Sequence, residues 1–412
     1  MSRVILHADC NSFYATVEQL YQPKLRNTAM AVGGSEESRH GIILAKSDEA
    51  KKRGVKTGDP LWLARQKCPG IVIVPPNYER YLLFSKLARE IYSEFTDSVE
   101  SFGLDENWCD VTGSKRLFGD GQAIANTIRK RIKRELGITV SVGVSYNKIF
   151  AKLGSDMAAR DSVAVITRDN FRETVWTLPA GDLLYVGPAT KAKLQNKCIY
   201  TIGDIARQKP EYLRKLLGVW GVTLWRFANG FDDTPVANID YESQVKSIGN
   251  STTTPKDLVT DQDVRITLYV LAESVASRLR ENGFRCDTVQ IYIRYSDLFS
   301  FERQGKLAFS SCTSDMIADK AYELYKKNTE HRPIRSLGVR ACNLIPEDFT
   351  QFSLLPEIMR NEKRQTLESS IDILRYRFGG KSIQRAVMLA DKDLSRVDPK
   401  NDHVIHPVSF AM

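Results

Sequence analysis

Residues 4–20 read VILHADCNSFYATVEQL, and this stretch decides the class of fold. The apolar run over residues 4–8 predicts a short buried strand, and Asp9 falls at its end. Asn11 is a good N-cap for a helix that runs to Leu20 with apolar side chains on one face. The stretch therefore predicts a strand and a helix that meet beside a carboxylate, in a mixed layer of sheet and helix.

The same mixture of strands and helices continues along the chain. Strand-like runs lie at residues 42–45, 71–74, 139–146 and 163–166, and helical patterns lie at 81–95 and 123–136. Short helices broken by Gly and Pro follow, and residues 232–235 (DDTP) are the clearest linker signal. A second α/β unit comes next, with helices expected at 264–280 and 315–327 and strands at 288–295, 306–310 and 336–342. The predicted fold class is α+β with several domains.

The composition narrows the class of protein. The chain has 412 residues, 42% hydrophobic and 26% charged, as in globular proteins of about two to four domains. This excludes a wholly disordered chain, a collagen and a disulfide scaffold, while the net charge of +9 suits a polyanionic partner. The seven Cys have no zinc-knuckle spacing, and no apolar run suffices for a signal peptide or a membrane span. We therefore expect reduced thiols and a cytoplasmic protein without membrane attachment.

Three acidic residues are the candidates for chemistry. Asp105 and Glu106 lie within VESFGLDENWCDVT, residues 99–112, where apolar residues on both sides predict a strand end near the core. Carboxylates at such a place are costly unless they are neutralised, and a divalent cation is a natural partner. If Asp9 converges with this pair, the acids could hold two Mg²⁺ for phosphoryl transfer. The alternative is that Asp9 caps the following helix and that the acidic pair is a solvated turn.

Five motifs in order resemble those of Y-family, lesion-bypass DNA polymerases. The motif DCNSFYATVE at residues 9–18 resembles their opening motif, and LDE at 104–106 with DVT at 110–112 resembles their second acidic motif. The third resemblance is TVSVGVS at 139–145 with NKIFAKLGSDM at 147–157, and KSIG at 246–249 and IRSLGVR at 334–340 resemble two little-finger landmarks. Because order and spacing agree over about residues 3–346, the chain is similar to the bacterial members of that family.

The resemblance implies a right hand and a reaction. The implied parts are a palm at 1–20 and 75–165, fingers at 21–74, a thumb at 166–232, a little finger at 238–346 and a tail at 347–412. Asp9, Asp105 and Glu106 match the catalytic, metal-binding acids, and Cys10 would add its backbone carbonyl. The implied cofactor is a pair of Mg²⁺ ions, with Mn²⁺ as a substitute. The implied activity is template-directed addition of deoxynucleotides to a primer 3′ end, in translesion synthesis.

Tyr14 falls where the family places its steric gate, five residues after Asp9. A ring under the sugar would clash with a 2′-hydroxyl and select deoxynucleotides, and Phe13 would support that ring against the incoming nucleotide. The alternative is that Phe13 and Tyr14 are an aromatic pair that packs the helix against the palm.

The triphosphate-binding positions depart from the family pattern. Asp48 and Lys51 stand where the family usually has Tyr and Arg, and Ala159 replaces a Lys, with Arg160 next to it. Asp48 would repel phosphate unless it turns away. The nucleotide-binding candidates are Phe13, Tyr14, Lys46, Lys51 and Arg160. The alternative for the lysine run near residue 51 is a solvated face.

The sequence also offers candidates for binding DNA and a partner. VGPATKAKL at 186–194 resembles a helix-hairpin-helix, in which backbone N–H groups hold a phosphate without reading sequence. The DNA-binding candidates are Gly187, Ala189, Lys191 and Lys193 in the thumb and Lys246, Ser247 and Arg340 in the little finger. Residues Gln351, Phe352, Ser353, Leu354 and Leu355 resemble the peptides that dock bacterial polymerases on the sliding clamp, although the final aromatic is missing. After them, Leu367, Ile371, Leu374 and Phe378 repeat at helical spacing before Gly379, which predicts an amphipathic helix.

The expected partners are primer-template DNA, dNTPs and the sliding clamp, and we expect a monomer. Two other functions stay open at this point. One is a DNA-binding damage-response protein that keeps the fold but has lost polymerisation, and the altered triphosphate positions make it conceivable. The other is a nucleotidyl cyclase with a similar palm, which would need neither a thumb, a little finger nor a clamp peptide.

Overall fold

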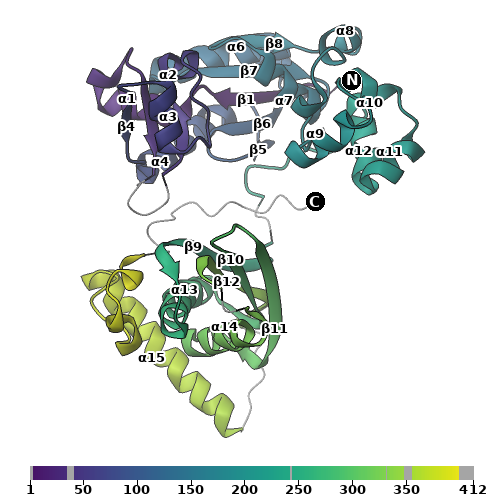
Figure 1. Cartoon of the computed structure of the whole chain (residues 1–412). Helices are drawn as coiled ribbons and strands as arrows, with labels where there is room; N and C mark the ends of the chain where they lie inside the picture. The colour runs from purple at the N-terminus through teal and green to yellow at the C-terminus, as the bar shows by residue number, and fades with distance from the viewer. Residues whose placement is uncertain (1–2, 35–40, 242–243, 331, 348–354, 399–412) are drawn as a thin grey trace. The chain divides into compact units, whose positions relative to one another are not determined.

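The computed structural model describes residues 3–34, 41–241, 244–330, 332–347 and 355–398 (Figure 1). The chain divides into two compact units, the first built from Met1–Gly34 and Ile42–Glu242 and the second mainly from Ser243–Met412. The structure has both helices and sheets in each unit, which confirms the predicted α+β class. In the described part of the chain no helix is both long and apolar enough to cross a bilayer. The seven cysteines are free thiols.

The first unit is built around a sheet of five strands in the order β5-β6-β1-β7-β8. Its strands are β1 (Ile5–Cys10), β5 (Val99–Ser101), β6 (Glu106–Asp110), β7 (Val140–Ser145) and β8 (Val163–Val165). The predicted strand at residues 4–8 is therefore β1, which extends through Asp9 to Cys10. It lies in the middle of the sheet, antiparallel to β6 and β7, so both of its edges are hydrogen-bonded to a neighbouring strand.

The two faces of β1 pack against different helices because successive side chains of a strand point to opposite sides. Leu6, Ala8 and Cys10 join the core with α1 (Phe13–Tyr21), α4 (Tyr78–Ser93) and α6 (Gly121–Arg131). His7 and Asp9 face α7 (Lys148–Met157), which carries their contacts with Ser155 and Lys152. The alternation of β1 thus directs Asp9 to the α7 side of the sheet.

Helix α7 lies unusually close to the sheet. A Cβ atom at Gly143 of β7 would lie 1.9 Å from the carbonyl oxygen of Ala151, so only glycine fits there. Asn147 is the N-cap of the helix, and its side chain accepts a hydrogen bond from the N–H of Phe150 at 2.7 Å. This close approach brings the side chains of α7 within reach of the acidic end of β1.

A smaller sheet of three strands in the order β3-β2-β4 belongs to the same unit. Its elements are β2 (Met30–Gly33), β3 (Ile43–Lys46), β4 (Val72–Val74), α2 (Asp48–Lys52) and α3 (Leu61–Lys67). Ala31, Ile43, Ala50, Leu61 and Ala64 form part of its own small core. This sheet lies within the segment predicted as fingers.

Short helices make up the last part of the first unit: α8 (Phe171–Val175), α9 (Pro188–Gln195), α10 (Ile202–Arg207), α11 (Pro210–Leu217) and α12 (Val219–Ala228). Residues 232–235, predicted as a linker, remain packed against the first unit. Asp232 is 7% exposed and accepts a hydrogen bond from the N–H of Lys148, and the N–H of Ala237 donates to Glu100. The division between the units falls instead at Glu242 and Ser243, because the preceding segment packs against the large sheet.

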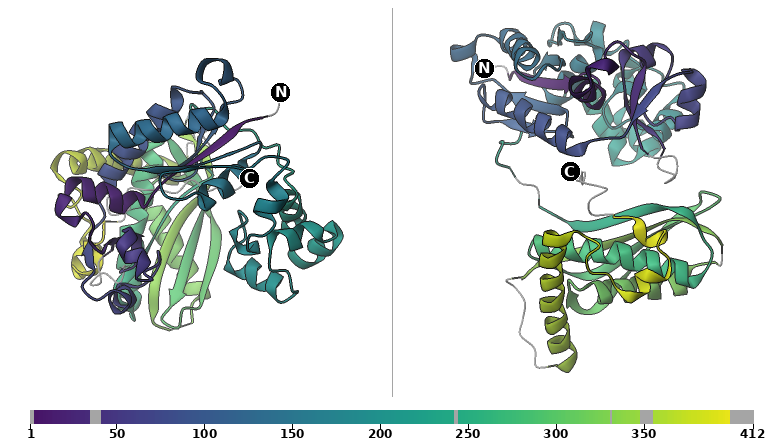
Figure 2. Two further views of the ribbon diagram at one scale, coloured as in Figure 1. Left: turned by 90° about the horizontal axis from the view of Figure 1, so that it is seen from above. Right: turned by 90° about the vertical axis from the view of Figure 1, so that its left-hand side faces the viewer.

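The second unit is an antiparallel sheet in the order β11-β10-β12-β9, covered on one face by α13 (Asp261–Glu281) and α14 (Ser314–Asn328) (Figure 2). Its strands are β9 (Ser247–Leu258), β10 (Phe284–Tyr295), β11 (Ser300–Ser311) and β12 (Ile334–Pro346). Strand β9 was not predicted, because its run SIGNSTTTPKDL is polar and contains Pro255. It is an edge strand, where such a sequence is tolerated.

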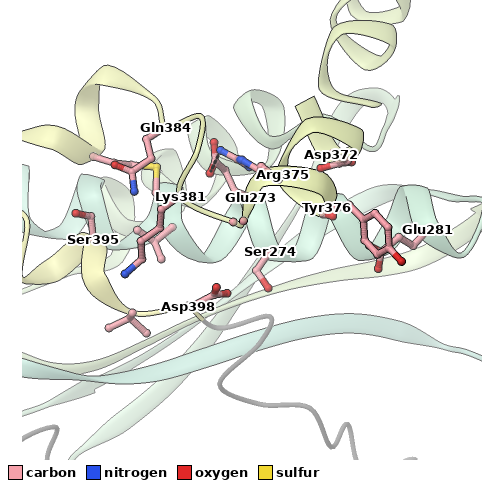
Figure 3. A pocket seen from close by; sticks show the side chains of 16 residues that line it. Glu273, Ser274, Glu281, Asp372, Arg375, Tyr376, Lys381, Gln384, Ser395 and Asp398 are labelled. Carbon is pink, nitrogen blue, oxygen red and sulfur yellow. Dashed lines mark hydrogen bonds and ion pairs between the residues drawn. The ribbon is translucent and has the colours of Figure 1, made fainter. Parts of the chain in front are cut away.

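The tail continues this second unit. Helix α15 (Pro356–Phe378) and the short turns η5 (Ala386–Ala390) and η6 (Leu394–Arg396) lie against α13, and a pocket between them is lined mostly by polar side chains (Figure 3). The helix predicted in the tail exists and ends at Gly379 with a φ of 95°. It docks through Asn361 and Glu368, whereas Leu367 and Phe378 are 61% and 72% exposed.

Candidate active site

The three predicted acids meet at one edge of the large sheet. Asp9 of β1 lies directly opposite Glu106, the first residue of β6, in the antiparallel register. The N–H of Cys10 donates a hydrogen bond of 3.1 Å to the carbonyl oxygen of Asp105. Backbone pairing therefore brings together residues that are almost one hundred positions apart in the sequence.

Their charges are poorly compensated by the protein. Burial and the neighbouring carboxylates raise the pKa of Asp9 to about 8, against only partial relief from Lys152. Burial and Glu106 likewise raise the pKa of Asp105 to about 6. Burial also raises the pKa of Glu106, but the contacts with His7 and Lys152 outweigh it and leave that pKa below its ordinary value. Among the described residues, the positive charge near Asp9 and Asp105 is therefore too small to offset their burial and mutual repulsion.

Lys152 was not among the predicted site residues, yet its ammonium lies against the acids. Its Nζ lies 2.8 Å from Oε2 of Glu106, 3.2 Å from Oδ1 of Asp156 and 4.0 Å from Oδ2 of Asp9. Lys152 and Asp156 are four residues apart on α7, a spacing that puts both on one helix face and could have indicated the pair. His7 was missed as well, and its Nε2 lies 3.4 Å from Oε2 of Glu106.

The acids fit a divalent cation in their chemistry. Among the described residues, no three His, Cys, Asp or Glu side chains already surround an ion position, and Glu106 is paired with Lys152. Yet the backbone pairing gathers the carboxylates of Asp9, Asp105 and Glu106 at one place, and carboxylate oxygens are the ligands that Mg²⁺ prefers. The thiol of Cys10 is 3% exposed and burial raises its pKa, so this residue could contribute only through its backbone. The donor set therefore suits Mg²⁺ once the side chains turn toward it.

Tyr14, predicted as the steric gate, belongs to an aromatic cluster. Its ring stacks on Tyr81 with centroids 4.2 Å apart and an interplanar angle of 10°, and Tyr78 meets it edge-on. Burial and the nearby Asp105 raise the pKa of Tyr14 to about 12, so its hydroxyl stays neutral. Phe13 is only 3% exposed, so its ring lies in the core and contacts Tyr14 rather than facing solvent. Both interpretations of Tyr14 are compatible with this half-buried position.

The predicted triphosphate-binding residues lie on two parts of the first unit. Nζ of Lys46, at the end of β3, donates a hydrogen bond of 3.0 Å to Thr57, and Lys51 is exposed on α2. Arg160 follows α7 and forms an ion pair with Asp48, the first residue of α2. The carboxylate of Asp48 thus points toward a guanidinium that we had expected to be free for phosphate.

The predicted DNA-binding residues are accessible in both units. Gly187 caps α9, and Gly187, Ala189, Lys191 and Lys193 are exposed around the first turns of this helix. In the second unit Lys246 and Ser247 are exposed at the start of β9, and Arg340 of β12 is exposed opposite Gly249. A Cβ at Gly249 would lie 2.9 Å from Cβ of Arg340, so the glycine leaves room for the aliphatic part of the arginine side chain. Of the clamp-like peptide, Gln351, Phe352, Ser353 and Leu354 lie outside the described residues, and Leu355 is exposed before α15.

Two family models match the chain, the impB/mucB/samB family over residues 8–156 and its C-terminal domain over residues 245–354. A DNA polymerase IV from Acetivibrio thermocellus is 53% identical over 399 residues, which cover 96% of this chain and 100% of that protein. DNA polymerase IV 2 from Bacillus subtilis is 35% identical over 394 residues, covering 94% of this chain and 95% of that protein. A solved chimeric Y-family DNA polymerase has the same fold, with a TM-score of 0.73, 23% identity, and coverage of 83% of this chain and 99% of that chain.

The fold is that of a Y-family polymerase. The chain belongs to the Y family of DNA polymerases, within the group whose members are named DNA polymerase IV. This confirms the resemblance that the five motifs indicated.

Proposed function

We propose that this chain copies a DNA template by adding deoxynucleotides to a primer 3′ end, including synthesis past damaged template. The observation that carries the proposal is the meeting of Asp9, Asp105 and Glu106 at one edge of the central sheet, with more negative charge than the protein neutralises. Near-full-length similarity to proteins named DNA polymerase IV supports the same activity.

The side chains of Asp9, Asp105 and Glu106, with the backbone carbonyl of Cys10, would hold two Mg²⁺ ions, or Mn²⁺ in their place. The chemistry that these ions supply when bound is a lowered pKa for the primer hydroxyl and stabilisation of charge on the leaving pyrophosphate. Glu106 is the acid that we assign to the primer side. The ammonium of Lys152 stabilises the ionised acids while the ions are absent, and Tyr14 would lie under the sugar as a steric gate.

We assign the palm to residues 1–20 and 75–165, the fingers to 21–74, the thumb to 166–232 and the little finger to 238–346, of which the residues up to Glu242 belong to the first compact unit. The accessible first turns of α9 support backbone contacts of the thumb with phosphate, since the first N–H groups of a helix lack internal partners. Exposed Lys246, Ser247 and Arg340 would contact the DNA backbone from the little finger. Lys46, Lys51 and Arg160 are the proposed cations for the triphosphate.

The tail supplies the proposed link to a partner. Residues 351–355 would dock on a sliding clamp, with Gln351 as the hydrogen-bonding residue and the apolar side chains in a groove. A chain acting in this way on chromosomal DNA would work as a monomer in the cytoplasm.

Primer extension with Mg²⁺ and single dNTPs tests the proposal. Asp9→Asn, Asp105→Asn and Glu106→Gln should each lower the extension rate by at least about 100-fold, since even outer-shell partners of metal sites are worth about 10- to 100-fold. The matched control is Glu90→Gln, an acid of α4 with a 57% exposed side chain, which should extend normally. A Glu106→Gln chain that copies DNA at the wild-type rate would contradict the assignment. A wild-type chain that binds DNA without extending it would favour the impaired damage-response protein instead.

A further inference from the structure

The turn that follows α7 is held rigidly beside the acidic end of β1. The hydroxyls of Ser141 and Ser162 both donate to the carbonyl oxygen of Ala159, at 3.0 and 2.6 Å. The N–H of Asp161 donates 3.1 Å to the side-chain oxygen of Asn11, which follows Asp9 by two residues. The backbone on either side of Arg160 is therefore tied to the same strand end that carries the acids.

Asp161 adds a second set of restraints to this turn. The φ of Asp161 is 56°, in the left-handed region. Its carboxylate is paired with Arg129 of α6 at 2.8 Å and with Lys133 at 2.7 Å, in the helical turn that continues α6. A residue in that conformation persists where its surroundings determine it. Because the backbone is fixed from both sides, the part of Arg160 that can move is its side chain.

The side chain of Arg160 reaches helix α2, which follows strand β3 of the smaller sheet. Its guanidinium is paired with the carboxylate of Asp48 on α2, and the two side chains are 40% and 39% exposed. An ion pair at that exposure is weak enough to be exchanged, because water and salt screen it. Helix α2 also carries Lys51, whose charge acts together with burial to lower the pKa of Lys46.

We propose that Asp48 acts as an internal competitor for the triphosphate: it occupies the guanidinium of Arg160 until the phosphates of an incoming nucleotide displace it. This rests on the proposed polymerase function and adds a residue that sets nucleotide affinity in it. A guanidinium binds carboxylate and phosphate with the same planar fork, so one partner can replace the other without a new geometry. Each binding event then includes the breaking of the Asp48–Arg160 pair. The free energy of that ion pair is therefore subtracted from the apparent binding free energy of the dNTP.

Steady-state single-nucleotide insertion by the full chain tests the competition. Asp48→Asn should lower KM for dNTP about three- to fivefold, the worth of an exposed ion pair of up to about 1 kcal/mol, with a smaller effect on kcat. Arg160→Ala should raise KM. The matched control is Glu49→Gln, which makes the same charge change one residue further along α2 and should shift KM by less than about twofold.

The double variant separates competition from simple repulsion of phosphate. In an Arg160→Ala background Asp48→Asn has no guanidinium to release, so KM should change no more than with Glu49→Gln. An equal decrease of KM in both backgrounds, or an unchanged KM for Asp48→Asn alone, would overturn the inference. If the wild-type chain does not extend primers at all, the proposed function itself fails, and the two failures are thereby distinguished.

Discussion

At the scale of single residues, Tyr14 has two candidate roles, packing of α1 and steric selection of the sugar. It is half-buried, stacks on Tyr81 and lies near Asp105, so it could pack α1 or face a sugar. Ribonucleotide incorporation distinguishes these purposes, since packing alone does not discriminate a 2′-hydroxyl.

We expect Tyr14→Ala to relax discrimination against ribonucleotides by about 10- to 200-fold, the range for steric selection in a pocket, while some deoxynucleotide insertion remains. Tyr14→Phe keeps the ring and is the matched control, which should discriminate as the wild type does. The measurement is the ratio of kcat/KM for dNTP to that for the matching rNTP. Unchanged discrimination in Tyr14→Ala would leave Tyr14 with a packing role alone.

At the scale of elements, α15 shows that a helix need not dock through its apolar stripe. Its Glu368 is 4% exposed and is paired with Arg280 at 2.6 Å and with Arg385, while the N–H of Ser314 donates to it at 3.0 Å. The arginines belong to α13 and to the segment before η5, so this carboxylate joins three parts of the second unit. Breaking a buried network of this kind leaves uncompensated charge.

Glu368→Ala should therefore destabilise the second unit by about 3 kcal/mol and speed hydrogen exchange in α13 and α14. The control is Lys327→Ala on α14, whose 67% exposed side chain pairs with Glu323 and whose loss should cost less than about 0.5 kcal/mol. Denaturant unfolding of the full chain with peptide-resolved hydrogen exchange measures both. Equal effects of the two substitutions would show that the α15 contact contributes little.

At the scale of the whole molecule, the first unit carries the acidic site, and the second unit carries the exposed DNA-binding candidates Lys246, Ser247 and Arg340. The clamp-like peptide lies between the last strand of the second unit and α15. A partner held there would act through tethering, which raises the local concentration of primer without altering chemistry.

Replacing residues 350–354 with Gly and Ser of equal length should reduce clamp-stimulated extension and spare basal extension. The replacement stops before Leu355 and Pro356, because these residues begin α15. Primer extension with and without the clamp is the measurement, and the same replacement in residues 403–407 is the control. Equal loss of stimulated and basal extension would argue against docking.

Much of the fold was already determined locally. The apolar run at residues 4–8, the alternation at 139–146 and the helical spacing in the tail each predicted an element that the structure contains. Asp9, Asp105 and Glu106 were predicted as a site from their motifs, because strand ends and acidic pairs are local features of a sequence. Strand β9 escaped because a polar edge strand has no hydrophobic periodicity to detect.

Only the tertiary structure decided which side chains meet. Lys152 contacts Glu106 because α7 lies close enough to β7 for Gly143 to be required, and nothing near either residue indicates this. Asp48 and Arg160 are 112 positions apart, and each by itself suggested only repulsion or attraction of phosphate. Periodicity within an element reports which face is buried, whereas the partner of a charge depends on how separate elements pack, and that is a property of the folded chain as a whole.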